Sequence, residues 1–266
     1  MRIAQVVLPG APAYERKCQR VDYAALSERH DVTVVAIEDI ARSGAAVAHV
    51  YAGRELPASA FVRFAVPYVA TAPLPRSRWS WRKPVAPRFV VSPVGENALP
   101  EAVEEKWFSA TYDRVASDVK VLGSFARTAT RDYVERTLAR ISRTRSDITW
   151  KQFDDPSPED LAGVDAWIDP AMSEDDYDGC VAEALVLGVP VVASRTPMNA
   201  QRLEQGRTGL LVPMNDPNEM THAILAALFK NEVAESRKIA AKQTVSKLRP
   251  RQRLRLLTRL YEQSIS

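Results

Sequence analysis

The sequence predicts an α/β protein with two domains, each built on a parallel β-sheet that is covered by helices. Short apolar, β-branched runs alternate with amphipathic segments, and this alternation is typical of parallel sheets. It is interrupted near residues 92–100 and then resumes. The length of 266 residues allows two domains of about 100–150 residues each. Ligands of such folds lie at the carboxyl ends of the strands.

The first half of the chain, residues 1–92, has room for four or five strands and little else. Pro9-Gly10 is a turn that ends the first strand. Residues 73–88 combine prolines and basic residues with Trp79 and Trp81, so we expect an exposed loop there. The predicted strands cover residues 3–8, 32–37, 45–51, 66–71 and 88–92, and the predicted helices cover residues 14–29 and 55–64.

The second half, residues 93–248, repeats the pattern. Ser157 and Asp216 each precede a proline and acidic residues, which is typical of a helix start. The last segment, residues 249–266, has leucines at helical spacing, and we expect it to pack across the junction between the domains. The predicted strands cover residues 119–122, 166–168, 189–193 and 209–212, and the predicted helices cover residues 102–108, 130–142 and 181–187.

The composition excludes several classes of protein. With 46% hydrophobic and 26% charged residues, the chain is neither disordered nor fibrous. No apolar run approaches the ~20 residues of a membrane span, and the first residues do not read as a signal peptide. Cys18 and Cys180 cannot form a disulfide framework or a multi-cysteine zinc site. We therefore expect a cytoplasmic protein, and the net charge of +3 is too small to indicate nucleic acid.

The segment that carries chemistry is an acidic loop that leads into the helix predicted at residues 181–187. Gly179 and Cys180 stand at the start of this helix, where free N–H groups and the positive end of the dipole favour a diphosphate. Glu183 lies a little more than one turn further, on the same side, where a carboxylate can accept both hydroxyls of a ribose. The alternative interpretation is a capped helix behind a solvated acidic loop.

Residues 173–217 resemble the nucleotide-binding domain of GT-B glycosyltransferases of the retaining family 4 type, glycosyl transferases group 1. That family has an acidic residue, seven intervening residues and a glutamate, as Asp175 and Glu183 stand here. The family patterns A-x-x-x-G-x-P-V-V-A-[ST] and G-x-T-G-L-L-V-P-x-x-D-P continue to Pro217. The resemblance implies a compact GT-B fold of two Rossmann-like domains, in which the first, on the acceptor side, is shortened and the second binds a nucleotide sugar.

The resemblance also implies residue roles. Asp175 and Glu183 are the expected catalytic residues, with Asp175 facing the donor sugar. The donor is a nucleoside diphosphate sugar, and neither a cofactor nor a metal is required. The family has an arginine after the strand predicted at residues 119–122. Ser124 occupies that position here, so Arg127 and Arg131 are the candidates that join the amides of Gly179 and Cys180 around the diphosphate.

Other positions depart from the family. The glycine loop of the first domain is reduced to Gly10-Ala11, and Gly10 is the ligand-binding candidate there. Asp178 replaces a glycine and can itself cap the following helix. No histidine follows Thr71, and His49 is expected to pack or to line the site without transferring protons.

These observations favour a glycosyltransferase that moves a sugar from a nucleoside diphosphate sugar to an unidentified acceptor. The departures support an alternative, a catalytically degenerate GT-B binding module or a subunit of a transferase complex. A further alternative is a sugar-nucleotide epimerase or hydrolase. Since the first half is short, a second copy or a partner transferase subunit could complete the acceptor site. The loop at residues 73–88 suggests peripheral contact with the inner face of the membrane.

Overall fold

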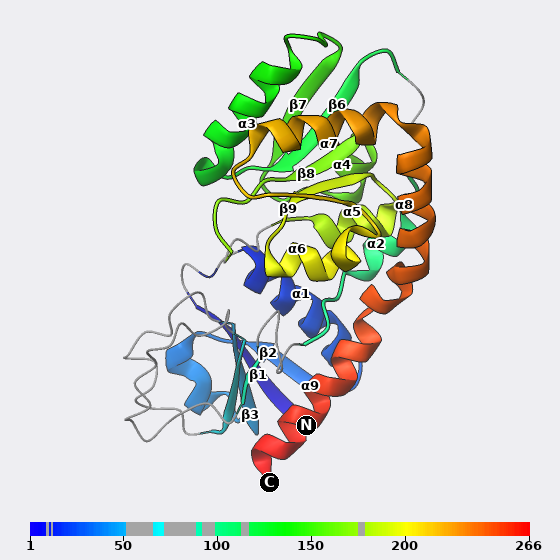
Figure 1. Ribbon diagram of the computed structural model, residues 1–266. Coiled ribbons are helices and arrows are strands. Elements are labelled where there is room, and N and C mark those ends of the chain that lie inside the picture. Colours follow the sequence, from blue (N-terminus) through cyan, green and yellow to red (C-terminus); the bar gives the residue numbers. More distant parts are fainter. Residues whose placement is uncertain are drawn as a thin grey trace. The chain divides into compact units, whose positions relative to one another are not determined.

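Figure 1 shows the computed structural model, which describes residues 1–8, 11, 13–51, 66–71, 89–91, 99–112, 117–174 and 179–266. The chain divides into two compact units. One contains Met1–Glu104 together with Arg249–Ser266, and the other contains Glu105–Leu248. The domain boundary expected between residues 92 and 93, the helix expected at residues 55–64 and the loop expected at residues 73–88 lie outside the described residues.

The first unit is built on a five-stranded parallel sheet with the order β2-β1-β3-β4-β5. Ile3 of β1 lies opposite Val32 and Val47, and it faces α1, whereas Ala4 faces the other side of the sheet with Ile40. Both faces are apolar because both are covered. The elements are β1 (Arg2–Val7), α1 (Ala13–Ser27), β2 (Asp31–Val34), η1 (Ile37–Arg42), β3 (Val47–Tyr51), β4 (Tyr68–Thr71) and β5 (Phe89–Val91).

The last helix, α9 (Pro250–Ile265), belongs to the first unit although it ends the chain. It packs on α1, β3 and β4, and Leu257 and Tyr261 are fully buried there. Arg253 forms a buried bidentate pair with Asp22 of α1, at 2.6 and 2.8 Å. The Tyr51 hydroxyl donates to the same carboxylate at 2.8 Å. The predicted leucine stripe thus forms the core face of this helix.

The second unit has another five-stranded parallel sheet, in the order β10-β9-β8-β6-β7. Helices α3 and α7 share one apolar core with the sheet, and α5 contacts β8 and β9. The strands are β6 (Lys120–Phe125), β7 (Ile148–Phe153), β8 (Ala166–Asp169), β9 (Val191–Ser194) and β10 (Leu210–Val212). The helices are α2 (Glu105–Ser109), α3 (Thr128–Ile141), α4 (Pro158–Ala162), α5 (Val181–Leu187), α6 (Pro197–Arg202), η3 (Glu204–Gly206), α7 (Pro217–Phe229), α8 (Asn231–Thr244) and η4 (Val245–Leu248).

Both sheets follow the same plan. In each sheet the strand that comes first in the chain (β1 or β6) lies next to the edge strand, which is the second in the chain (β2 or β7). The remaining three strands follow in chain order on the other side of the first strand. This is a doubly wound arrangement in which the direction of winding reverses once. The reversal lies between β1 and β3 in the first unit and between β6 and β8 in the second. Ligands of such sheets bind outside the carboxyl ends of the two strands that flank the reversal.

The predicted class, an α/β chain with two parallel sheets, is confirmed. Helix α5 covers the predicted residues, and Ser157 and Asp216 cap α4 and α7 through their side chains as expected. Among the α-helices and strands that the structure describes, β7, α6 and α8 were not predicted. In the described parts of the chain, no helix is both long and apolar enough to cross a bilayer.

Candidate functional site

The carboxyl ends of β6 and β8, which flank the reversal in the second sheet, carry an ion pair. Arg127 follows β6 and is the residue before the first turn of α3, and Asp169 is the last residue of β8. Arg127 Nη2 donates to Asp169 Oδ1 at 2.6 Å. The two side chains are 9% and 2% exposed, so this charge-assisted hydrogen bond is strong. The pair lies where the topology predicts a ligand.

The second oxygen of Asp169 also has a donor. Asn199, at the start of α6, donates from Nδ2 to Asp169 Oδ2 at 2.7 Å and to the Ser194 carbonyl oxygen at 3.1 Å. The backbone N–H of Asn199 donates to Thr196 Oγ1 at 3.1 Å, which is the N-cap bond of α6. Asn199 and Asp169 are both fully buried. The Asp169 carboxylate is therefore held between residues of two different elements.

The start of α5 is packed against this pair. A Cβ added to Gly179 would lie 2.5 Å from Asp169 Oδ1 and 3.2 Å from Arg127 Nη2, so only glycine fits without a shift. Gly179 and Cys180 remain partly exposed. Cys180 is the N-cap residue of α5, and its side chain makes no capping hydrogen bond. The Arg127 guanidinium thus lies beside Gly179, two residues before α5.

Glu183 lies in the first turn of α5 and is only 3% exposed. A carboxylate in the first turn is stabilised by the positive end of the helix dipole. Gly179 precedes the N-cap residue Cys180 and so lies just before α5. Of the residues expected at the site, Arg127 therefore lies beside Gly179, Cys180 is the N-cap residue of α5, and Glu183 is in the first turn of that helix.

Other predicted residues lie elsewhere or outside the described residues. Arg131 is on the exposed side of α3, where its Nε donates to Glu135 at 2.9 Å in a surface pair. Asp175, Asp178 and Gly10 are outside the residues that the structure describes. Of the two arginine candidates, Arg127 lies beside Gly179.

The predicted end of the strand expected at residues 119–122 is wrong. Strand β6 continues to Phe125, so Ser124 is inside the sheet and does not follow it. Ser124 is buried, and its hydroxyl accepts a hydrogen bond from Trp150 Nε1 of β7 at 2.9 Å. Arg127 is the first cation after the strand.

Asp169 and Asn199 were missed by the sequence analysis. Asp169 directly follows the apolar run predicted at residues 166–168, and a carboxylate in that place is a signal for a site residue at the carboxyl edge of a sheet. Asn199 gives a weaker signal, because the short helix that presents it was not predicted.

His49 is a structural residue of the first unit. It is fully buried, with Nδ1 2.5 Å from the Tyr261 hydroxyl and Nε2 2.7 Å from Thr71 Oγ1. Burial lowers the pKa of His49 from its ordinary value of 6.5 to about 3. The imidazole is therefore neutral at physiological pH. This geometry matches the packing role expected for His49.

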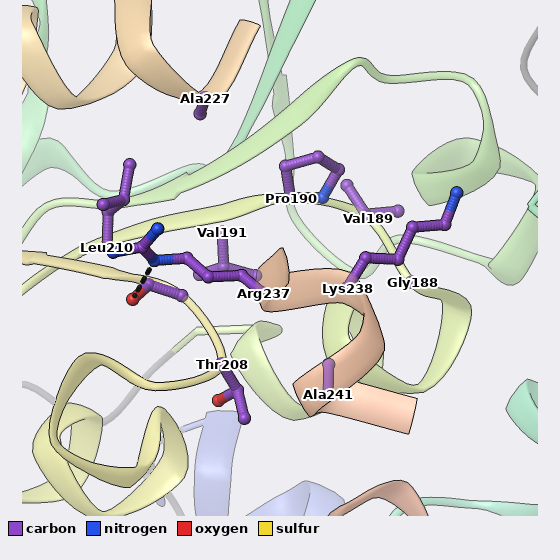
Figure 2. Close-up of a pocket in the computed structure, with 11 residues that line it drawn as sticks. Gly188, Val189, Pro190, Val191, Thr208, Leu210, Ala227, Arg237, Lys238 and Ala241 are labelled. Carbon is purple, nitrogen blue, oxygen red and sulfur yellow. Dashed lines mark hydrogen bonds between the residues drawn. The ribbon is translucent and has the colours of Figure 1, made fainter. Parts of the chain in front are cut away.

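The second unit also has a small hollow away from this site (Figure 2). It lies beside the amino ends of β9 and β10, whereas Arg127 lies at the carboxyl ends of the strands. Arg237 of α8 donates from Nε to the Gly209 carbonyl oxygen at 3.3 Å, which closes one side. Lys238 and Ala241 of α8 line the hollow together with Pro190. Within the described residues, no group of three His, Cys, Asp or Glu side chains is arranged to hold a metal ion.

The fold and this site define a GT-B-type architecture with a candidate nucleotide site in its second unit. Residues 101–230 match the family described as glycosyl transferases group 1, over slightly less than half of the chain. No match is found among curated protein sequences.

Solved structures of glycosyltransferases share the whole fold. A glycosyltransferase from Rickettsia africae is 13% identical, with a TM-score of 0.73 over 100% of this chain and 98% of the other. Sucrose-phosphate synthase from Thermosynechococcus elongatus is 14% identical, with a TM-score of 0.72 over 99% and 98%. HepE from Anabaena, solved in complex with UDP, is 12% identical, with a TM-score of 0.66 over 99% and 100%. The GT-B fold recognised in the sequence is confirmed.

Proposed function

We propose that the protein is a glycosyltransferase that uses a nucleoside diphosphate sugar as donor. The observation that carries the proposal is the Arg127 guanidinium, held beside Gly179 at the carboxyl edge where the second sheet reverses. An arginine fork suits phosphate oxygens, and the exposed start of a helix adds N–H donors. HepE, which shares this fold, was solved with UDP and with UDP-glucose, so uridine nucleotides are the first to test.

Each site residue has a role in this proposal. Arg127 and the amides of Gly179 and Cys180 bind the diphosphate, and Glu183 accepts hydrogen bonds from the ribose hydroxyls. Asp175 faces the transferred sugar. As the bond between the sugar and the diphosphate breaks, negative charge grows on the leaving phosphate, and donors that are already oriented stabilise it. This step needs no metal in the proposed mechanism.

Calorimetric titration of UDP, GDP, ADP and TDP into wild type, Arg127→Gln and Glu183→Gln tests nucleotide binding. We expect wild type to bind one of them and each variant to bind it at least about tenfold more weakly, as loss of a charged hydrogen bond predicts. Arg131→Gln is the matched control, because it removes one exposed arginine of the same helix region. Equal affinity of wild type and both site variants would overturn the proposal.

A nucleotide-binding module without transferase activity is the second candidate. The observations that favour it are departures from the family: no histidine follows Thr71, and the first half of the chain is short. Incubation of the isolated chain with the bound nucleotide sugar and a mixture of sugar and lipid acceptors separates the two. Transfer supports the first candidate, and binding without turnover supports the second. Release of free sugar, or a rearranged nucleotide sugar, would indicate a hydrolase or an epimerase.

A further inference from the structure

We infer that Asp169 and Asn199 are positioning residues that fix the Arg127 guanidinium for the diphosphate. This inference rests on the proposed function and extends it to two residues that act through Arg127. Arg127 is oriented by Asp169 Oδ1 at 2.6 Å, and Asp169 is oriented by Asn199 Nδ2 at 2.7 Å. All three side chains are at least nine-tenths buried.

The orientation of Asn199 is set by its own contacts. Its Nδ2 faces two acceptors, the Asp169 carboxylate and the Ser194 carbonyl oxygen, so this atom must be the amide nitrogen. Its Oδ1 lies 3.5 Å from Arg202 Nη1. Its backbone N–H is bound to the side chain of Thr196, the N-cap residue of α6. The amide of Asn199 is therefore a fixed donor.

This fixed donor determines the plane of the Asp169 carboxylate. Each carboxylate oxygen accepts one bond, from Asn199 on one side and from Arg127 on the other. The carboxylate cannot turn without breaking one of them. Arg127 Nη1 also lies 3.5 Å from the Pro170 carbonyl oxygen, just beyond β8. The guanidinium fork is thus held at two nitrogens against the end of β8.

Gly179 places α5 against the held fork. Its Cα approaches Asp169 and Arg127 so closely that a Cβ would overlap the carboxylate. A long arginine side chain loses substantial conformational freedom when it must be ordered at the moment of binding. An arginine that is already held in place avoids this loss and keeps its remaining N–H donors in one orientation. Asp169 therefore orients Arg127, and the binding of phosphate depends on that orientation.

A double-mutant cycle on nucleotide affinity tests the inference. The ligand is whichever of UDP, GDP, ADP and TDP the wild type binds. The variants are Arg127→Gln, Asp169→Asn and the double variant. We expect each single change to weaken binding about tenfold or more, and the double variant to bind no more weakly than Arg127→Gln. This non-additivity is expected only if Asp169 acts through Arg127, since independent roles would add. Thermal unfolding of each variant shows whether the affinities are compared between folded proteins.

Asn199→Ser provides a second route, because it removes the long amide donor and leaves the charged pair in place. It is expected to weaken binding severalfold, and this loss should disappear in the Arg127→Gln background. Affinity of Asp169→Asn or Asn199→Ser equal to that of wild type overturns the inference while the proposed function stands. Tighter binding by Asp169→Asn also overturns it, since Asp169 would then compete with phosphate. A wild type that binds none of the four nucleotides overturns the proposed function and the inference together.

Discussion

Replacement of Gly179 by alanine tests the packing between α5 and the Arg127–Asp169 pair. The added Cβ would lie 2.5 Å from Asp169 Oδ1, about 0.9 Å short of ordinary contact at 3.4 Å. The carboxylate cannot easily yield, because Arg127 and Asn199 hold its two oxygens. Either these bonds lengthen or the start of α5 moves away. Overpacking of this kind costs about 1–3 kcal/mol.

Because both responses disturb the proposed diphosphate site, we expect Gly179→Ala to lose nucleotide affinity by about tenfold and to unfold at a lower temperature. Gly163→Ala is the matched control in the same unit. Its Cβ would meet only the Asp160 carbonyl oxygen at 3.3 Å and that of Glu159 at 3.5 Å, at the end of α4. Calorimetric titration and thermal unfolding measure the two effects. Wild-type affinity and stability in Gly179→Ala would refute the packing argument.

Two further predictions concern the first unit. Arg253→Met leaves Asp22 buried without its cation, so we expect it to lower the free energy of unfolding by about 3–5 kcal/mol, measured by urea titration followed by circular dichroism. Arg255→Met, at an exposed position of the same helix, should change this free energy by less than about 0.5 kcal/mol. Similar values for the two variants would contradict this prediction. Burial lowers the pKa of His49 to about 3 in the folded protein, so as the pH falls the unfolded chain is protonated before the folded protein. The contribution of His49 to the free energy of unfolding is therefore complete above pH 6.5 and decreases as the pH falls towards about 3. At pH 5 this loss reaches about 2 kcal/mol, and His49→Gln should show a correspondingly flatter dependence of the urea midpoint on pH between 7 and 5; an unchanged slope would contradict the assignment.

Most of the fold could be predicted because its signals are local. The run of Val181 to Leu187 with Gly188 after it has one consistent reading as a short helix, and Gly188 indeed ends α5 with a positive φ of 81°. Strand β7 was missed because its residues alternate between half-buried and exposed, as expected at the edge of a sheet, and lack a continuous apolar run. Helix α8 was missed because it is strongly polar, with little apolar periodicity along its length.

The site was only partly predictable because its contacts join distant segments. The start of α5 and Glu183 follow from one continuous motif, but the partner of Arg127 is 42 residues away and that of Asp169 is 30 residues further. Such contacts depend on which strands are neighbours in the sheet. The order of the strands was not derivable from the alternation alone, since that pattern fits several parallel arrangements. With the order known, the pairing of Arg127 and Asp169 follows from the adjacency of β6 and β8.

The same topology serves different purposes in the two units. In the first sheet, the strands that flank the reversal carry Gln5 and Tyr51, whose side chains are joined by a 3.2 Å hydrogen bond and continue to Asp22 and Arg253. This network is fully buried, and the last helix of the chain supplies its cation, so it stabilises the unit. In the second sheet, Arg127 follows β6 and Asp169 ends β8, beside Gly179 and Cys180, which precede α5 and remain partly exposed. This partial exposure beside an ordered charged pair is why we propose that the nucleotide binds at the second unit and not at the buried network of the first.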